Sequence, residues 1–397
     1  MRTDAARPHM PVYLDFNATT PVDPQVVAAM TPFWTDHFYN PSAAYPEALT
    51  VQSALDQARA AVAALLGADR EPHSIVFTSG GTESNNWVLR GMWMGRRSRR
   101  HRLVLSAVEH PAVVETATVL ASLGAEIVTI PVDAQGVIRL DALDAALDEQ
   151  TALVSIMLAN NEIGTIQPVA EVARRAHAVG SWVHTDAAQA VGKIPVDVAQ
   201  LGVDFLTVAG HKFYAPKGIG ALYIRPGVTL PPMMTGGGQQ EGWRSGTEPV
   251  PLIVGLGKAA QLARAWIQQD GPRHQAALRQ ALEIQLREAY PDITVFGTGA
   301  DRLPNTLALA HPAWTGSALL AACPAIRAGT GSACHHPDDT GSPTLRALGV
   351  APALAGGLVR LSLGRETTAE DLAVVSTALT QAFSTCSPLS EHKECER

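Results

Sequence analysis

Cysteine is scarce in this sequence, and only Cys323, Cys334, Cys386 and Cys395 occur among its 397 residues. So few cysteines in a chain of this length do not form a disulfide scaffold of the kind found in small secreted domains. The first ten residues contain two arginines but no apolar core, so no secretory signal is visible. We therefore expect a reducing, cytoplasmic location in which at least one thiol is free to react.

Long apolar runs and a strong excess of charge are also missing. No segment approaches the roughly 18 apolar residues of a membrane-spanning helix, so we expect no membrane association. The net charge of −7 gives no reason to expect a nucleic-acid partner. The one basic cluster, from Arg96 to Arg102, is short, and we interpret it as a solvated loop. With 46% hydrophobic and 17% charged residues, the composition is that of a compact folded protein.

Short apolar runs alternate with helical patterns through the first two thirds of the sequence. The runs lack strict alternation of polar and apolar residues, as expected for strands that are buried on both faces. The helical patterns at Val51–Leu66 and Val169–Val179 each stop at a glycine. This alternation predicts an α/β domain with a mainly parallel sheet and with ligands at the carboxyl ends of its strands. The expected strands are Ile75–Thr78, Leu103–Ser106, Glu126–Ile130, Ala152–Leu158, Ser181–Thr185, Asp204–Val208 and Gly220–Ile224.

From about Pro249 the pattern changes to that of a second, smaller α+β domain. We expect a large domain at residues 21–258 and a small domain formed by residues 1–20 and 259–397. The expected elements of this part are helices at Pro251–Gln268 and His274–Ala289, strands near Thr306–Ala310 and Leu358–Leu363, and a final helix with a capping box formed by Thr368 and Asp371.

Three of the expected strands are followed by residues that carry chemistry. In the loop Ser79–Thr82, two glycines let the backbone close around an anion, and the start of the next helix offers N–H groups. No Lys-Ser/Thr pair follows these glycines, so a small fixed phosphate fits better than a nucleotide. An aspartate, Asp186, and a lysine, Lys212, follow the other two strands. The alternatives are an ordinary turn, a helix N-cap at Asp186 and a surface position for Lys212.

One cofactor requires all three features together. Pyridoxal 5'-phosphate needs a lysine amine, an acidic partner for its pyridine nitrogen and a cradle for its phosphate. A lysine that is buried beside other cations has a lowered pKa and becomes an amine nucleophile. His110, which follows the strand Leu103–Ser106, is placed to stack on the ring, although a lone histidine also fits a structural role.

Cys334 follows a run of small residues, Gly329–Ala333, and precedes His335 and His336. The small residues predict a mobile arm, and nearby imidazoles, if protonated, favour the thiolate. The alternatives are an incidental exposed cysteine or a metal site that also uses Asp338 and Asp339. The spacing matches no tetrahedral zinc pattern, so we expect no metal. We interpret the other three cysteines as bystanders.

From Tyr13 to Phe383, the chain resembles the cysteine desulfurases, which are class V aminotransferases within the fold type I pyridoxal-phosphate enzymes. The resemblance implies that fold, with a large domain and a smaller one, and a homodimer. It is carried, in order, by Tyr13–Pro21, Ser79–Asn86, Asn160–Gly164, His184–Lys193, His211–Gly218, Gly236–Glu248 and Gly331–Cys334.

The resemblance also implies roles for individual residues. Lys212 matches the Schiff-base lysine, Asp186 the partner of the pyridine nitrogen, and His110 the stacking histidine. Cys334 matches the cysteine that carries the persulfide. The remaining matches are Gln189 at the ring hydroxyl; Gly81, Thr82, His211 and, from the other subunit, Thr247 at the phosphate; Asn161 at cofactor and substrate; and Arg360 and Asn40 on the substrate side.

Several positions differ from the family pattern. Ala209 stands where a phosphate-binding serine is usual, Tyr45 replaces a histidine, and Glu241 replaces an arginine. His335 and His336 replace the usual Ser/Thr after the cysteine. The Cys-His pair also resembles selenocysteine lyases, and the same loop pattern occurs in desulfurases that serve DNA phosphorothioation.

We therefore expect a pyridoxal-phosphate enzyme that converts L-cysteine to L-alanine. Its sulfur would be captured as a persulfide on Cys334 and passed to an acceptor protein, either an iron–sulfur scaffold or a thio-modification enzyme. Selenocysteine lyase is the first alternative, and a true aminotransferase is the second. A catalytically silent sulfur-transfer scaffold is the alternative from another functional class.

Overall fold

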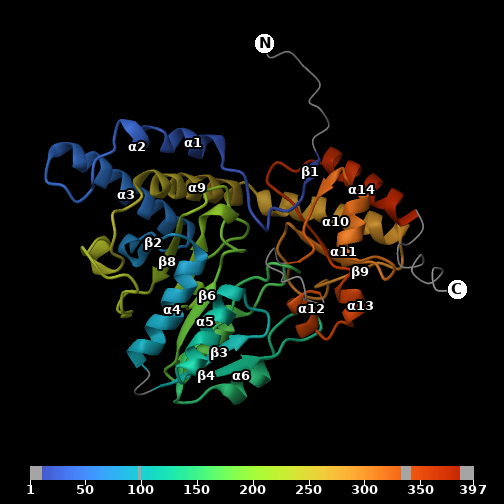
Figure 1. Ribbon diagram of the computed structural model, residues 1–397, viewed down its shortest axis with the longest axis horizontal. Helices are drawn as coiled ribbons and strands as arrows, with labels where there is room; N and C mark the ends of the chain where they lie inside the picture. The colour runs from blue at the N-terminus through green and yellow to red at the C-terminus, as the bar shows by residue number, and fades with distance from the viewer. Residues whose placement is uncertain (1–10, 97–99, 332–340, 385–397) are drawn as a thin grey trace, which may run out of the picture.

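A seven-stranded sheet forms the centre of the larger part of the molecule (Figure 1). The computed structural model describes residues 11–96, 100–331 and 341–384. Strand β8 is antiparallel to β2 and β7, and all other neighbouring strands are parallel, so the prediction of a mainly parallel sheet is confirmed. The sheet order is β2 (Ile75–Thr78), β8 (Gly220–Ile224), β7 (Phe205–Ala209), β6 (Trp182–Asp186), β5 (Thr151–Ser155), β3 (Arg102–Ser106) and β4 (Glu126–Ile130).

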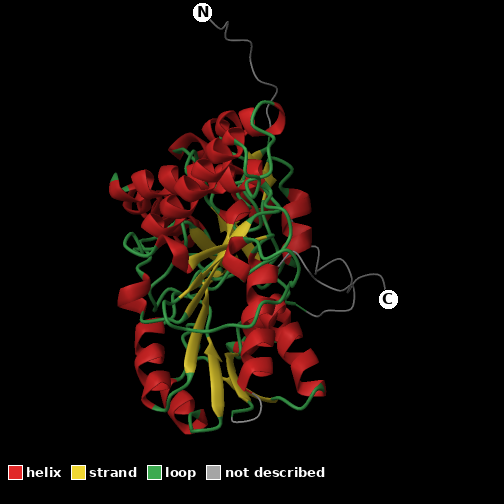
Figure 2. Cartoon of the chain, turned by 90° about the vertical axis from the view of Figure 1, so that its left-hand side faces the viewer, coloured by secondary structure: helices red, strands yellow, loops and turns green. Residues whose placement is uncertain are grey.

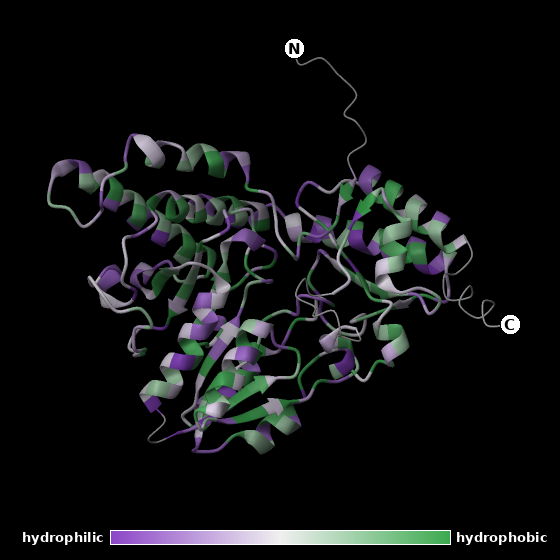
Figure 3. Cartoon of the chain, in the orientation of Figure 1, coloured by the Kyte–Doolittle hydropathy of each residue, from purple (hydrophilic) through white to green (hydrophobic). Residues whose placement is uncertain are grey.

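Both faces of this sheet are buried, which explains the near-continuous apolar strands. In β3, Val104 belongs to one core, while Leu103 and Leu105 belong to the core on the opposite face. Figure 2 shows helices on both sides of the sheet, and Figure 3 shows how apolar its strands are. The covering helices include α4 (Gly81–Arg96), α5 (Pro111–Ser122), α6 (Leu140–Ala146), α7 (Val169–Ala178) and α8 (Val198–Leu201).

Two long helices pack against each other beside the sheet. These are α3 (Pro46–Leu65) and α9 (Val250–Gln268), and the short helices α1 (Pro24–Met30) and α2 (Pro32–Thr35) precede them. Contact between α3 and α9 is close, because a Cβ added at Gly257 would lie 2.5 Å from the Cα of Ala58. Helix α9 runs unbroken across residue 258, so the domain boundary proposed there falls inside a helix.

A second core forms in the C-terminal third, and the N-terminal strand joins it. The apolar side chains of Leu14, Leu307 and Leu361 pack in this core, which brings both ends of the described chain together. Strand β10 pairs antiparallel with β9 and β12, and β1 pairs parallel with β11. The elements are β1 (Val12–Tyr13), α10 (Gly271–Ala289), β9 (Thr294–Val295), β10 (Thr306–Ala310), α11 (Gly316–Ala322), β11 (Ile326–Arg327), α12 (Pro343–Ala347), α13 (Pro352–Ala355), β12 (Val359–Ser362) and α14 (Ala369–Ser384).

The capping box predicted before α14 is confirmed. The backbone N–H of Thr368 donates to Asp371 Oδ2 at 2.9 Å, and the backbone N–H of Asp371 donates to Thr368 Oγ1 at 3.1 Å. Each side chain therefore satisfies an N–H group that the first turn of the helix leaves unpaired.

The basic cluster near Arg96 is partly ordered by contacts with the rest of the chain. The Arg96 guanidinium lies 3.9 Å from the centre of the Trp182 ring, and Arg100 donates to two backbone carbonyls. Arg102 forms ion pairs with Glu126 and Asp148. The interpretation of a solvated loop is therefore wrong for these three arginines. No helix among the described residues combines the length and the apolar character needed to cross a bilayer.

Candidate active site

The carboxyl ends of the parallel strands border a cavity of about 280 Å³. Most of the residues expected at the site line this one cavity, although they come from separate parts of the sequence. The expected residues among its lining are Gly81, Thr82, His110, Asn161, Asp186, Gln189, His211, Lys212 and Arg360. Asn17, Ala18, Asn85 and Ala209 also contribute to the lining.

Lys212 reaches the cavity from the turn that follows β7. Its Nζ donates to the backbone carbonyls of Asn17, at 2.7 Å, and Ala18, at 2.8 Å. Both carbonyls belong to the segment between β1 and α1, so the N-terminal part of the chain holds this amine. The alternative of an ordinary surface lysine does not fit these contacts.

Asp186 is the last residue of β6, and only 7% of it is exposed. Its Oδ2 accepts a hydrogen bond from Asn85 Nδ2 at 2.7 Å, and its Oδ1 accepts one from the backbone N–H of Ala188 at 2.9 Å. Asn85 comes from α4, so this helix and the turn after β6 together fix the carboxylate. The second contact resembles the capping role considered for Asp186, but no helix begins there.

His184 lies two residues earlier on β6 and is fully buried. Its ring nitrogens pair with Ser155 Oγ at 2.8 Å and with Thr207 Oγ1 at 3.0 Å. Burial lowers the pKa of His184 to about 4, although nearby Asp186 acts in the opposite direction. This imidazole is therefore neutral at neutral pH, and hydrogen bonds from β5 and β7 satisfy it.

His110 is the N-cap of α5, where its Nδ1 accepts a hydrogen bond from the backbone N–H of Ala112 at 3.1 Å. Burial lowers the pKa of His110; Asp186 opposes this effect and Lys212 adds to it. The ring is therefore neutral at neutral pH. Because Nδ1 is an acceptor, the proton of the neutral ring is on Nε2.

Glu109 is buried beside His110. Its Oε1 accepts hydrogen bonds from Ser106 Oγ at 2.5 Å and from the backbone N–H of Met157 at 2.8 Å. Oε2 has no hydrogen-bond partner among the described residues. Burial raises the pKa of Glu109 to about 8, partly opposed by its hydrogen bonds and increased by the charge of Asp186. Glu109 therefore keeps its proton at neutral pH.

The anion cradle expected after β2 is formed by the turn at Gly80 and by the start of α4. Gly80 has a φ of +151°, which favours glycine, and Gly81 begins the helix. Strand β8 lies close behind this turn, because a Cβ added at Gly220 would lie 2.7 Å from the Cα of Gly80. The first N–H groups of a helix have no partners within it, and its dipole favours an anion there.

His211 lies at the same cavity and contacts Thr19 Oγ1 through Nδ1 at 3.1 Å. Burial lowers the pKa of His211 to about 4, and the charge of Lys212 contributes. A neutral imidazole can donate one hydrogen bond to a bound phosphate without adding a positive charge.

Arg360, on β12, brings the C-terminal part of the chain to the cavity. Its Nη1 donates to the backbone carbonyl of Asn161 at 2.9 Å, and its Nη2 pairs with Asp15 Oδ1 at 2.6 Å. Its Nε is buried and has no hydrogen-bond partner among the described residues. Gly329 forms an isolated antiparallel β-bridge with Arg360. Gly329 lies near the end of the described stretch that precedes Cys334 in the sequence.

Three expected site residues do not line the cavity of the described chain. Asn40 is exposed, and its side chain accepts a hydrogen bond from the backbone N–H of Ser42. Thr247 is also exposed. Cys334 lies outside the described residues, together with the histidines and aspartates of the alternative metal site.

Sequence reasoning assigned no role to several residues that the structure places in or beside the site. Asn17, Asn85 and Lys193 lie within the quoted motifs, and Glu109 adjoins His110. Membership of these motifs is the available signal for the first three residues, and the neighbouring His110 is the signal for Glu109. What each one contacts depends on partners that are distant in the sequence.

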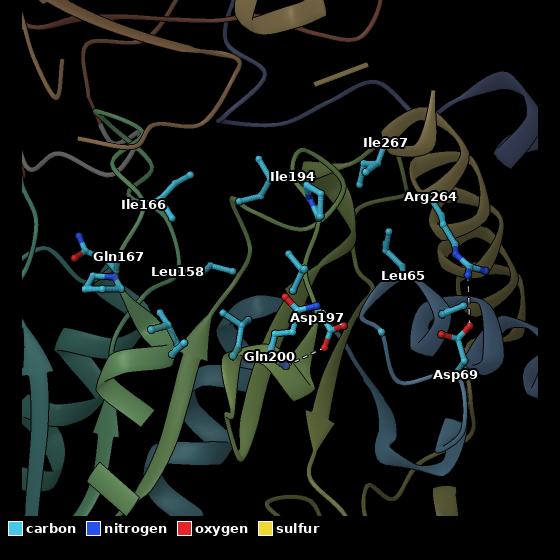
Figure 4. A pocket seen from close by; sticks show the side chains of 18 of the residues that line it. Leu65, Asp69, Leu158, Ile166, Gln167, Ile194, Asp197, Gln200, Arg264 and Ile267 are labelled. Carbon is cyan, nitrogen blue, oxygen red and sulfur yellow. Dashed lines mark hydrogen bonds and ion pairs between the residues drawn. The ribbon is translucent and has the colours of Figure 1, made fainter. Parts of the chain in front are cut away.

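A larger hollow, of about 690 Å³, lies elsewhere between α3, α7, α8 and α9 (Figure 4). Its lining is mainly apolar, and the labelled charged groups already contact the chain itself. Asp69 lies 3.6 Å from Arg264, and Asp197 accepts hydrogen bonds from the first N–H groups of α8. Although this hollow is the larger of the two, its lining among the described residues does not combine a lysine, a buried carboxylate and a glycine turn at a helix start, as the lining of the smaller cavity does.

The smaller cavity suits pyridoxal phosphate in the types of group that it offers. An amine, a buried carboxylate and a helix N-terminus are the three groups that this cofactor requires. Asn85 Oδ1 and Arg360 Nε are buried polar atoms without partners among the described residues, so the lining has unused hydrogen-bonding capacity. A cavity of about 280 Å³ lies near the lower end of the usual range for small-molecule sites.

Comparison with known proteins agrees with this arrangement. Residues 12–375 match the family model of class V aminotransferases. The chain is 44% identical to the cysteine desulfurase IscS of Methanosarcina thermophila, with 91% of this chain and 89% of the relative covered. It is 46% identical to a cysteine desulfurase of Gluconacetobacter diazotrophicus, with 91% and 90% covered.

Solved structures resemble the chain over most of its length. A NifS-like protein matches with a TM-score of 0.88 at 36% identity, covering 94% of this chain and all of that protein. The structure of SspA in complex with cysteine matches with a TM-score of 0.78 at 34% identity, covering 90% of this chain and 99% of SspA.

Proposed function

The chain belongs to the class V aminotransferase family and, within it, to the cysteine desulfurases, and we propose that it uses pyridoxal phosphate bound at Lys212 to move sulfur from L-cysteine to Cys334. The observation that carries this proposal is the convergence of Lys212, Asp186, His110 and the Gly81 helix start on one cavity. The cofactor, when bound, supplies an electron sink for the substrate α-carbon.

An amine, a carboxylate and a helix start would hold the cofactor. The Lys212 amine would bind its aldehyde, and the Asp186 carboxylate would keep its ring nitrogen protonated. The N–H groups at Gly81 and Thr82 would receive its phosphate. Asn85 would keep Asp186 in place, because it already donates to one carboxylate oxygen at 2.7 Å.

Lys212 would also move a proton. After the substrate amine takes its place at the cofactor, the Lys212 amine would act as the base that takes the α-proton of L-cysteine and later returns a proton to the product. The carbonyls of Asn17 and Ala18 are acceptors at 2.7 and 2.8 Å that can orient this amine. These two carbonyls hold the amine at the cavity, and as uncharged acceptors they do not form an ion pair with it.

Arg360 is the best candidate for binding the substrate carboxylate. Its guanidinium is nearly fully buried, and its Nε has no partner among the described residues. Asp15 and the Asn161 carbonyl fix the other two nitrogens, so the plane of the guanidinium is set before substrate arrives. A preorganised arginine costs less ordering when a carboxylate binds.

The sulfur step needs no external oxidant or reductant. The thiolate of Cys334 attacks the substrate sulfur, a sulfur–sulfur bond forms, and the Cβ–S bond breaks. Its electron pair stays on carbon, which takes up a proton, so L-alanine leaves while the enzyme retains a persulfide. Gly329, which precedes Cys334 in the sequence, forms a β-bridge with Arg360.

We also propose a homodimer whose partner subunit contributes Thr247 to the phosphate site. This residue is exposed and does not line the cavity of its own chain, as expected if it serves the other subunit. Large apolar side chains are exposed near α2 and α3, with Trp34 59%, Phe38 67% and Leu49 63% exposed. Such a concentration of exposed apolar surface is typical of an interface.

The decisive experiment is mass spectrometry of the Cys334 peptide after the cofactor-loaded protein is treated with L-cysteine. We expect one added sulfur atom on Cys334 and an equal amount of L-alanine. Cys334→Ala should lose both products, whereas Cys323→Ala, at a buried thiol, should retain them. Sulfur release that persists in Cys334→Ala would contradict the proposal, and greater turnover of L-selenocysteine than of L-cysteine would favour the lyase alternative.

The identity of the sulfur acceptor and the cytoplasmic location stay predictions. An iron–sulfur scaffold and a thio-modification enzyme are the two acceptor classes expected. Incubating the persulfide form with each candidate and measuring the loss of sulfur from Cys334 would distinguish them.

A further inference from the structure

Lys193 is a buried lysine that lies beside the cavity but does not line it. Only 7% of the residue is exposed. Its Nζ donates to Gln189 Oε1 at 2.6 Å and to Asn17 Oδ1 at 2.8 Å. Both partners line the cavity, so this lysine contacts the site through two amide side chains.

The first contact selects one orientation of the Gln189 amide. With Oε1 facing Lys193, Nε2 donates to the Asn17 carbonyl at 2.9 Å. In the flipped orientation, the amide N–H groups would face an ammonium donor and the amide oxygen would face a carbonyl oxygen. The contact between the two oxygens is repulsive whatever the protonation state of Lys193, and the contact with Lys193 is repulsive when its amine is an ammonium, so Lys193 and the Asn17 carbonyl together fix the amide. Gln189 therefore has its second N–H group, rather than its carbonyl oxygen, to offer at the cavity that it lines.

The second contact fixes Asn17, which is 1% exposed. Asn17 Oδ1 also accepts from Asn305 at 2.9 Å, and Asn17 Nδ2 donates to Thr306 Oγ1 at 2.9 Å. The backbone carbonyl of the same residue accepts from the Lys212 amine. Lys193 thus stabilises the segment that orients Lys212.

We propose that Lys193 is a positioning residue that holds the Gln189 amide with its N–H directed at the ring hydroxyl of bound pyridoxal phosphate. This inference rests on the proposed function. It concerns how the chain prepares the site, and Lys193 itself need not touch cofactor or substrate.

Among the described residues, the charged groups that face Lys193 are Lys212 and Arg360, and the titratable ring of His211 also feels its charge. Burial, followed by the charges of these two residues, lowers the pKa of Lys193 well below its ordinary value. In either protonation state the Lys193 amine can donate the two hydrogen bonds observed. A methionine at this position would fill similar space but leave Gln189 Oε1 and one acceptor site of Asn17 unpaired, which weakens the preference for one amide orientation because only the Asn17 carbonyl then selects it.

The test compares Lys193→Met with Lys193→Gln, which keeps an N–H donor, and with Lys217→Met, which removes an exposed positive charge. Three quantities are measured on each folded protein: the dissociation constant for pyridoxal phosphate, the pH midpoint of the cofactor absorbance, and the melting temperature without cofactor. A purely structural role would change only the last.

We expect Lys193→Met to bind the cofactor about tenfold more weakly, as for loss of one buried hydrogen bond. Its absorbance midpoint should rise by about one pH unit, because the Gln189 N–H is no longer held at the ring hydroxyl, where it favours the deprotonated form. Lys193→Gln should bind within about twofold of the wild type, since its amide can replace the donor. Lys217→Met should match the wild type in both quantities.

A folded Lys193→Met protein with wild-type affinity and midpoint would overturn the inference. Equal impairment of Lys193→Met and Lys193→Gln would also overturn it, because the donor would then not matter. If Lys193→Met does not fold, Lys193→Gln decides alone, and a tenfold loss of affinity in that variant contradicts the inference. Failure of the proposed function gives a different result, in which the wild-type protein shows no cofactor absorbance at all.

Discussion

Burial sets the protonation states of the ionisable residues around the cavity. It lowers the pKa values of His184 and His211 to about 4 and raises that of Glu109 to about 8. At neutral pH these imidazoles are therefore uncharged, and Glu109 carries a proton. These three residues therefore add no charge beside the charged groups of a bound cofactor.

Glu109 should make the cofactor-free protein less stable as the pH rises. Its pKa is about 8 in the folded protein, against an ordinary value of 4.5. Between these values the folded state holds a proton that the unfolded state has lost. The Glu109 proton contributes its full share to the free energy of unfolding below about pH 4.5. This contribution, on the order of a few kcal/mol, is lost once the pH exceeds about 8.

Glu109→Gln should remove this part of the pH dependence. We expect its melting temperature to fall less than that of the wild type between about pH 5 and about pH 9. Glu115→Gln, at an exposed position on α5, is the matched control and should follow the wild type. Parallel curves for all three proteins would show that Glu109 titrates normally.

Ala209→Ser should tighten cofactor binding. Ala209 ends β7 and is buried. A Cβ added at Gly81 would lie 3.4 Å from the Cβ of Ala209. A hydroxyl here adjoins the phosphate cradle and can donate one hydrogen bond, which corresponds to about two- to tenfold in affinity. Equilibrium titration with pyridoxal phosphate measures the effect. Ala188→Ser, at the Asp186 side of the cavity, should not give this gain, and unchanged or weaker binding in Ala209→Ser would contradict the expectation.

At the scale of elements, strands were predicted more closely than helix starts. The strands β2, β4, β8 and β10 have the predicted bounds, because each is a short apolar run with clear ends. Strands β2, β8 and β10 are fully buried, whereas β4 lies at the sheet edge and is only partly buried. Helix α3 begins at Pro46, five residues before the predicted start at Val51, because its first turn is mostly exposed and carries little apolar signal.

Strand β5 shows the opposite error. The apolar run continues to Leu158, but the strand ends at Ser155. The residues Ile156–Ala159 are buried because they lead to the cavity, where Met157 and Ala159 form part of the lining. Hydrophobicity reports burial, so it cannot separate a strand end from a buried loop.

The packing of β8 against the Gly80 turn should be sensitive to a single methyl group. A Cβ added at Gly220 would lie 2.5 Å from the carbonyl oxygen of Val208 and 2.7 Å from the Cα of Gly80. Both neighbours are backbone atoms, so the turn must shift. We expect Gly220→Ala to lose roughly 1–3 kcal/mol of stability and to bind the cofactor more weakly.

Gly95→Ala provides the matched control in α4. Its added Cβ would lie 3.5 Å from Pro231, which is an ordinary contact. Because alanine favours helices, its stability should be unchanged or should rise by up to roughly 1 kcal/mol. Chemical denaturation measures both variants, and an equal response of the two would show that the turn tolerates displacement.

At the scale of the whole molecule, the cavity joins the parallel sheet, the N-terminal segment and the C-terminal core. Asp186 comes from the sheet, Lys212 from the turn after β7, Asn17 from the N-terminal segment and Arg360 from β12. The motifs indicated which residues belong to a site. They did not indicate the contacts between Lys193 and Asn17, which are 176 positions apart, because pairing of polar side chains at that separation leaves no local pattern.

The proposed homodimer makes a specific prediction about mixed subunits. Thr247→Val should weaken cofactor binding about tenfold, as for a lost hydrogen bond to a charged group. A hybrid of one Thr247→Val subunit and one Lys212→Ala subunit contains one site with both groups intact. Mixing the two inactive or weakened proteins should therefore restore wild-type affinity in half of the hybrid's sites. Without restoration in a hybrid verified by native mass spectrometry, Thr247 does not act across the subunit contact.

Borohydride reduction followed by peptide mapping would show whether Lys212 and Asp186 face one bound pyridoxal phosphate. Reduction makes the lysine–cofactor link permanent, so the modified residue can be identified by mass. We expect one reduced cofactor per chain, attached at Lys212, and a loss of this product in Asp186→Ala at limiting cofactor. Attachment at Lys193, Lys217 or Lys258 instead, or no stoichiometric attachment, would contradict this expectation.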